Sequence, residues 1–198
     1  MDSYDNLPDS EIKPVGTISK KFVELGIKSF KKACLYVHNG KYGYNSNNDD
    51  KLIFFKENMG SCTMKHATIA GLAEELRIPL YKYVGVYKFT EEITTGAGEI
   101  VKKYKIPYIP MVHCYLVYKN YRFDLTEGND NGKKTTIDVF IKSEKVIPFI
   151  SRTDEYKLFK KILKEEILPR KEMAGIDERS LLKAREESII LLKRCIEK

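Results

Sequence analysis

Residues 60–78 read GSCTMKHATIAGLAEELRI, and the rest of the chain is organised around this stretch. Apolar residues leave little polar surface in the middle of the segment, which is typical of a helix that is buried on all sides. The small residues among them allow neighbouring elements to approach closely. We therefore predict a central buried helix that carries Cys62 in its first turn.

The position of Cys62 favours a nucleophilic role. The thiolate is the reactive form of a cysteine. The first turn of a helix carries a partial positive charge and backbone N–H groups that stabilise a thiolate or an oxyanion. The alternative is that Cys62 is a small buried hydrophobic residue, which is the usual role of a free cysteine.

Composition predicts a soluble globular protein. The 198 residues are 42% apolar and 32% charged, which suits one domain. We place its core at residues 17–150 and a C-terminal helical extension at residues 151–198. The sequence has no apolar run of transmembrane length, and its acidic N-terminus lacks the apolar region of a secretion signal. We therefore predict a cytoplasmic protein that does not bind membranes.

Charge and cysteine spacing exclude two further classes of protein. The net charge of +7 is spread thinly, because residues 1–61 carry 9 basic and 8 acidic side chains and residues 62–150 carry 13 and 10. A nucleic-acid-binding surface needs clustered positive charge, so we predict no specific nucleic-acid partner. The four cysteines are irregularly spaced, which favours free thiols over a disulfide framework.

Residues 111–126 have the pattern of a β-hairpin in which Tyr118 faces Tyr121 across the tip. In this register one face of the pair is apolar. The other face carries His113 and Asp124 as diagonal neighbours, within side-chain reach of each other.

The remaining sequence predicts the elements that surround this hairpin. We expect the following segments: an extended lead-in over 1–16, a helix from Ser19 to His38 ending at Asn39-Gly40, a loop over 41–50, a strand from Leu80 to Phe89, a short helix from Glu99 to Tyr104, a loop over 127–134, one or two short strands within 137–149, and amphipathic helices over 154–168 and 177–196.

Cys62, His113 and Asp124 together have the composition of a catalytic triad. A cysteine nucleophile needs a base within hydrogen-bond reach, and that base needs a third group to orient it. In this interpretation His113 takes the thiol proton, and Asp124 holds the imidazole and stabilises its positive charge.

A metal site is the competing interpretation. Cys62 and His66 are four residues apart on the predicted helix, and His113 and Cys114 could complete a ligand set. Adjacent strand residues point to opposite faces, so this site requires a bulge in the strand. His66 is open to two further interpretations, as a group that supports Cys62 or as a packed polar residue.

The segment Gly60–Ala67, followed by small helical residues, resembles the nucleophile segment of the transglutaminase-like superfamily. Residues 113–118 (HCYLVY) and 123–126 (FDLT) resemble its His and Asp strands. Residues 42–46 (YGYNS) are similar to a branch of small bacterial proteins of this superfamily. The resemblance covers residues 40–127. It implies a papain-like α+β fold in which the cysteine helix packs on an antiparallel sheet.

The resemblance also implies acyl chemistry through a thioester, with Cys62, His113 and Asp124 as catalytic residues. The chain has no tryptophan, so it lacks the side-chain oxyanion donor of the eukaryotic transglutaminases. The backbone N–H of Cys62 remains, and Tyr42, Asn45 and His66 are candidates for oxyanion or substrate binding. We expect no cofactor, no metal and no calcium loop.

We therefore predict a cysteine-dependent hydrolase or acyltransferase that acts on a protein, peptide or small amide. The alternative is a non-catalytic binding or scaffold module with the same fold. Transfer from a thioester, as in arylamine N-acetyltransferases, would use the same triad. It would also be expected to require coenzyme A, for which the sequence offers no site.

Overall fold

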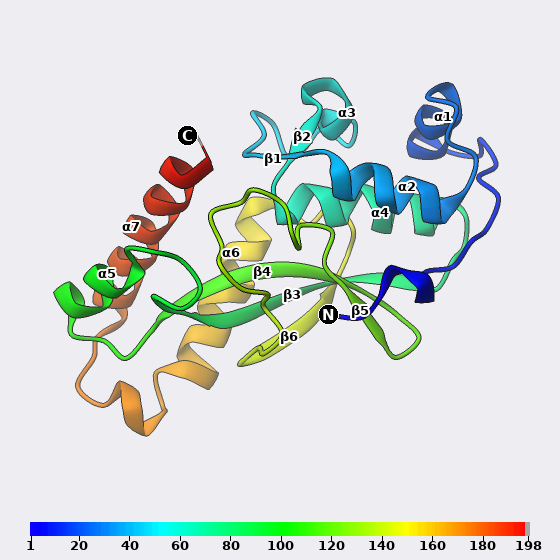
Figure 1. The fold of residues 1–198 in the computed structure, drawn as a ribbon. Helices are drawn as coiled ribbons and strands as arrows, with labels where there is room; N and C mark the ends of the chain where they lie inside the picture. The colour runs from blue at the N-terminus through cyan, green and yellow to red at the C-terminus, as the bar shows by residue number, and fades with distance from the viewer. Residues whose placement is uncertain (197–198) are drawn as a thin grey trace. The chain divides into compact units, whose positions relative to one another are not determined.

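The computed structural model describes residues 1–196 and has an α+β fold (Figure 1). Its elements follow in this order: η1 Tyr4–Asn6, α1 Thr17–Glu24, α2 Phe30–Asn39, β1 Lys41–Tyr42, α3 Ile53–Glu57, β2 Met59–Gly60, α4 Cys62–Glu75, β3 Leu80–Phe89, α5 Ala97–Tyr104, β4 Ile109–Tyr118, β5 Tyr121–Phe123, β6 Lys142–Val146, α6 Arg152–Ile162, η2 Leu163–Ile167, η3 Lys171–Met173 and α7 Glu178–Ile196.

The chain divides into two compact units. The first comprises residues 1–83, 114–129 and 145–151, and the second comprises residues 84–113, 130–144 and the chain from residue 152 on. The prediction of a single domain with a helical extension stays a prediction.

Strands β5, β4, β3 and β6 form an antiparallel sheet in that order. The predicted hairpin register is confirmed, because Tyr118 pairs with Tyr121 and Leu116 with Phe123. The hairpin is shorter than predicted: β5 ends at Phe123, so Asp124 lies beyond the paired residues. The Asp124 carboxylate accepts the backbone N–H of Thr126, a local bond that turns the chain away from strand geometry.

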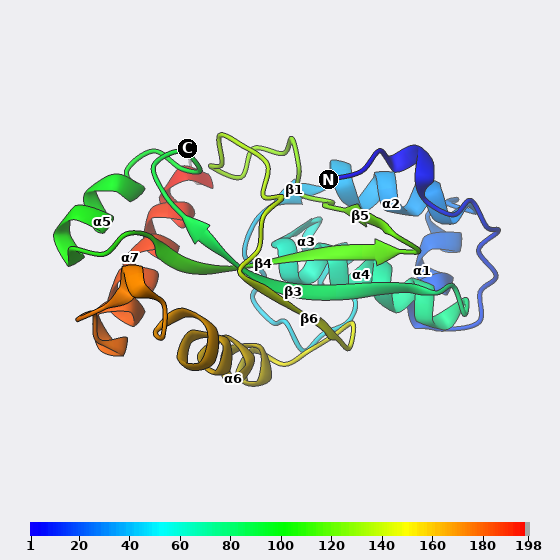
Figure 2. The same ribbon diagram turned by 90° about the horizontal axis from the view of Figure 1, so that it is seen from below.

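The predicted central helix is confirmed as α4, which begins at Cys62. Within the first unit it packs on the strands through a core that includes Leu80, Leu116 and Phe123. Helices α1, α2 and α3 contact α4 as well. Figure 1 shows α2 and α4 side by side on one face of the strands, and the view from below in Figure 2 places α4 behind them. Almost every residue of α4 up to Ala73 is buried, because elements cover it on several sides.

The close approach expected of the small residues in α4 occurs at Gly71. A Cβ atom there would lie 2.6 Å from Ile18 Cδ1 and 2.7 Å from Phe149 Cε2. We expect Gly71→Ala to lower the free energy of unfolding by about 1–2 kcal/mol, because overpacking outweighs the gain in helix propensity. The matched control is Gly98→Ala in α5, where the nearest neighbour is the flexible Glu91 carboxylate. This packing would be contradicted if urea unfolding gave Gly71→Ala the same free energy of unfolding as Gly98→Ala.

The prediction of one helix from Ser19 to His38 is wrong, since the structure has two. Helix α1 ends at Glu24, and Gly26 has φ of 75°, a left-handed conformation that favours glycine and stops a helix. Helix α2 then starts after Ser29, whose hydroxyl accepts the backbone N–H of Lys32. The periodic apolar pattern continued through this stop and cap, which is why the sequence suggested one helix.

Other boundaries follow the sequence with small corrections. Strand β3 has the predicted bounds, and α2 ends at Asn39, one residue beyond the predicted end at His38 and within the predicted stop signal. Residues 41–50 are not all loop, because Lys41–Tyr42 forms β1, which pairs in parallel with β2. The lead-in is not simply extended: it contains the short helix η1, and Leu7 and Ile12 are buried in the core.

The second unit has a core of its own. Its parts of β3 and β4 pack with α5, α6 and α7 around Phe89, Ile109 and Phe159, and α5 lies beside α7 (Figures 1 and 2). Among residues 1–196, none of the helices is both long enough and apolar enough to span a membrane.

Candidate functional site

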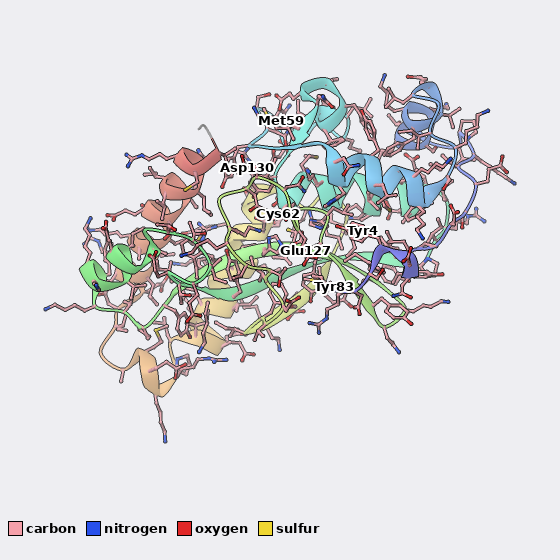
Figure 3. The ribbon with its side chains drawn as sticks, viewed as in Figure 1. Tyr4, Met59, Cys62, Tyr83, Glu127 and Asp130 are labelled. Carbon is pink, nitrogen blue, oxygen red and sulfur yellow. The ribbon has the colours of Figure 1, made fainter. Side chains whose placement is uncertain are left out.

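Cys62 is the first residue of α4 and is 9% exposed; Figure 3 marks it where this helix begins. Ser61 precedes it in an extended conformation (φ −71°, ψ 174°), and within the described residues its side chain forms no capping hydrogen bond. The charge of the helix dipole at the first turn is therefore not offset by a side-chain cap. This is an electrostatic setting that favours a thiolate.

His66, one turn further along α4, joins Cys62 to the segment after β5. Its Nδ1 lies 2.6 Å from the carbonyl oxygen of Cys62, and its Nε2 accepts the backbone N–H of Leu125 at 2.8 Å. A carbonyl can only accept, so Nδ1 carries the proton, while Nε2 must be bare to accept Leu125. The two backbone partners thus assign the neutral Nδ1–H tautomer to a fully buried ring.

Asp124 is buried beside this ring and is held in a tight turn. Its Oδ1 accepts the Thr126 N–H at 2.8 Å and the Thr126 hydroxyl at 2.6 Å. The same oxygen lies 3.5 Å from Nε2 of His66. Because Nε2 already accepts the Leu125 N–H, this short distance is proximity rather than an ion pair. His66 therefore holds the turn in place without forming an ion pair with the Asp124 carboxylate.

Tyr4 and His38, which lie much earlier in the chain, contact the same turn. The Tyr4 hydroxyl donates to the carbonyl oxygen of Asp124 at 2.6 Å. Nδ1 of His38 lies 3.3 Å from the carbonyl oxygen of Leu125 and 3.0 Å from the Tyr4 hydroxyl. Burial and the nearby Asp124 raise the pKa of Tyr4, so this hydroxyl keeps its proton as a donor. No sequence pattern predicted this contact, because Tyr4 lies in a polar lead-in that is 120 residues from Asp124.

Lys65 adds a buried positive charge near the turn. Its Nζ donates to the carbonyl oxygens of His38, at 3.0 Å, and of Gly40. Burial lowers the pKa of Lys65 to about 8, and the negative charge of Asp124 opposes that shift. The ammonium thus satisfies carbonyl groups at the C-terminus of α2 and lies close enough to Asp124 for the two charges to interact.

His113 belongs to the second unit, on strand β4, and is 2% exposed. Its ring meets the ring of Tyr87 edge-on at 6.3 Å between centroids. Its Nδ1 lies 3.4 Å from Nζ of Lys133. Cys62 and Asp124 lie in the first unit, where His66 links their segments. The pairing of His113 with them stays a prediction.

Tyr42 and Asn45, the predicted oxyanion or substrate-binding residues, lie in the first unit around β1. Tyr42 is 7% exposed and Asn45 is 5% exposed. The Asn45 amide donates to Glu57 at 2.8 Å and to the carbonyl oxygen of Met59 at 2.9 Å. Both bonds hold the loop after β1 against α3 and β2.

The metal alternative would draw its ligands from Cys62, His66, His113 and Cys114. Within residues 1–196, no group of three or more His, Cys, Asp and Glu side chains is arranged to hold an ion. Cys114 Sγ lies 3.7 Å from the hydroxyl of Thr63. Cys34 is fully buried in the core of the first unit, and this burial raises the pKa of its thiol.

The clamp formed by His66 predicts a stability effect. His66→Phe keeps an aromatic ring in the core but removes both hydrogen bonds to the backbone. The variant leaves the buried Leu125 N–H without its acceptor and removes the ring's bond to the Cys62 carbonyl, which should lower the free energy of unfolding by about 2–3 kcal/mol. Tyr4→Phe is the matched control, because it removes one donor from the same turn and should cost about 1 kcal/mol. Equal urea midpoints for His66→Phe and the wild type would contradict the clamp.

Comparisons of the chain with models of known protein families, with curated proteins and with solved structures find no match.

Proposed function

We propose that the protein is a cysteine-dependent acyl-transfer enzyme with a transglutaminase-like, papain-like core. In this proposal Cys62 is the nucleophile, His113 the base and acid, and Asp124 the residue that orients His113. The reaction class is amide hydrolysis, deamidation or transamidation of a protein, peptide or small amide.

One observation carries the proposal: the His66 ring is hydrogen-bonded to the backbone of Cys62 and to the backbone of Leu125 at the same time. Through this bridge the helix turn that begins at Cys62 is fixed relative to the turn that presents Asp124. A nucleophile and an orienting carboxylate need such restraint, since small displacements of reacting groups cost large factors in rate. Two residues of the predicted triad thus lie on segments that the His66 side chain connects within the first unit.

The chemistry proceeds in two balanced steps. His113 removes the proton from Cys62 Sγ, and the thiolate attacks the carbonyl carbon of the amide. The resulting oxyanion is stabilised by the backbone N–H of Cys62 at the helix N-terminus. The C–N bond breaks, and the leaving amine takes its proton from His113. Water or a second amine then attacks the thioester, which releases an acid or a new amide and restores the thiol.

We assign the oxyanion to the backbone because the Asn45 amide is engaged in its own loop. Tyr42, in β1, and Asn45, shortly after it, stay candidates for substrate binding. His66 acts through its backbone partners as a positioning residue.

Acyl trapping tests the proposal. With 4-nitrophenyl acetate, the acetyl group moves to Cys62 Sγ and 4-nitrophenolate leaves. We expect a stoichiometric burst of nitrophenolate and an acetyl group on the peptide that contains Cys62. Cys62→Ser should lose the burst, and Cys195→Ser should keep it. Cys195 is a stringent control for non-specific acetylation, because it is more exposed than Cys62. Acetylation that favours Cys195, or the absence of a burst, would support the binding-module alternative instead.

A further inference from the structure

A largely apolar groove lies in the first unit, at the C-terminal half of α4. Its volume is about 420 Å³, which is within the usual range of small-molecule sites. The groove is lined by α4, the start of β3 and the segment from Lys145 to Pro148. Two apolar side chains on this surface are exposed, Tyr81 at 43% and Ile147 at 68%.

Lys82 lies in the wall of this groove and is 1% exposed. Its ammonium donates to the carbonyl oxygen of Pro148 at 3.0 Å, and within residues 1–196 it has no ion pair and no other hydrogen-bond acceptor. An ammonium carries three N–H donors, so two of them lack a protein acceptor. Burying a charge in this way is costly unless an opposite charge pairs with it.

The other charged groups of the groove do not supply this counter-charge. Glu74 lines the groove but is exposed, and no ion pair joins it to Lys82 in the described chain. Lys145 lies over the ring of Tyr81 with its Nζ 3.3 Å from the ring centroid, which adds a second positive charge at the rim. The groove therefore combines an apolar lining with an excess of positive charge.

We infer that this groove binds a small amphipathic carboxylate, such as a medium-chain aliphatic acid. Its carboxylate forms an ion pair with Lys82. It also accepts hydrogen bonds from the two ammonium N–H groups that do not bind the Pro148 carbonyl. Its alkyl chain lies against apolar lining residues such as Ala70, Leu80 and Val146. Charge complementarity carries this assignment, because a neutral apolar ligand would leave the ammonium unpaired.

The site is separate from Cys62. Ala70 follows Cys62 by eight residues on α4, which corresponds to about 12 Å along the helix axis. Binding in the groove therefore does not depend on the proposed acyl chemistry, and the Cys62→Ser variant should bind the same ligand with unchanged affinity.

Calorimetric titration of the full chain with octanoate tests the site, with 1-octanol and acetate as probes of its two halves. We expect octanoate to bind more tightly than either probe. Lys82→Met keeps the length of the stem and should weaken octanoate about tenfold to a hundredfold. Lys145→Met is the matched control at the rim and should cost less than about fivefold, because exposed ion pairs are weak.

A second variant keeps the test decisive if Lys82→Met does not fold. Ile147 is exposed, so Ile147→Asp should fold normally, and its carboxylate at the groove should repel octanoate. Octanoate that binds Lys82→Met as tightly as the wild type would overturn the inference. So would 1-octanol that matches octanoate, acetate that matches octanoate, or an absence of octanoate binding to the wild type. Unchanged binding to Ile147→Asp would equally contradict the placement of the ligand.

Discussion

Replacing His113 with alanine is expected to slow the acylation of Cys62 by about 10²- to 10⁴-fold, the range that a general base contributes. Without the imidazole, both the proposed base for the Cys62 thiol and the proposed acid for the leaving group are missing. The measurement is the rate of the nitrophenolate burst under single-turnover conditions. Added imidazole should restore part of the rate to His113→Ala, because it supplies the missing base in solution.

Lys133→Met is the matched control for this prediction. Lys133 lies 3.4 Å from His113 Nδ1 but has no proposed role in proton transfer, so its loss should change the rate far less. A burst in His113→Ala that is as fast as in the wild type would remove His113 from the mechanism. A slow burst without imidazole rescue, together with altered unfolding, would assign His113 a structural role instead.

Asp124→Asn should lower the acylation rate by about 10⁴-fold while leaving the fold intact. Asparagine keeps an Oδ1 atom that accepts the N–H and hydroxyl of Thr126, so the turn after β5 persists. The negative charge that stabilises the imidazolium is lost. Burst kinetics measure the rate, and urea unfolding measured on the same samples reports the stability of the fold.

Asp124→Ala separates the two roles of this residue. It removes both the charge and the acceptor of the Thr126 bonds, so it should add a loss of about 1–3 kcal/mol in the free energy of unfolding. If Asp124→Asn acylates at the wild-type rate, the carboxylate acts only in the turn. The proposed orienting role would then be wrong.

The sequence predicted those features that depend on local pattern. The small-residue run after Cys62 predicted α4 and its N-terminal residue, because a helix that is buried all round must lack a polar face. Alternation around Lys119-Asn120 predicted the register of β4 and β5. Both signals need only near neighbours in the chain.

The contacts that hold the turn at Asp124 could not be predicted from such patterns. Tyr4 lies 120 residues from Asp124 and His38 lies 87 residues from Leu125, and each contact involves a backbone carbonyl. Every residue has a backbone carbonyl, so the sequence does not indicate which carbonyl accepts a hydrogen bond. The role of His66 was left open for the same reason, since both of its partners are backbone atoms.

The break between α1 and α2 shows a different limitation. Gly26 and Ser29 are a stop signal and a cap, but the apolar residues on both sides keep a helical spacing. Periodicity outweighed the two local signals in the prediction. In the folded chain the backbone conformation of Gly26 and the cap of Ser29 determine where each helix ends.

The pH dependence of alkylation at Cys62 tests the central claim most directly. Iodoacetamide is applied at a series of pH values, and each cysteine is quantified separately in the wild type and in His113→Ala. A thiolate–imidazolium pair predicts that Cys62 reacts at pH 6 far faster than the other three cysteines, and that His113→Ala loses this advantage. The account is contradicted if Cys62 in the wild type titrates as an ordinary thiol with a pKa of about 8.5 or does not react.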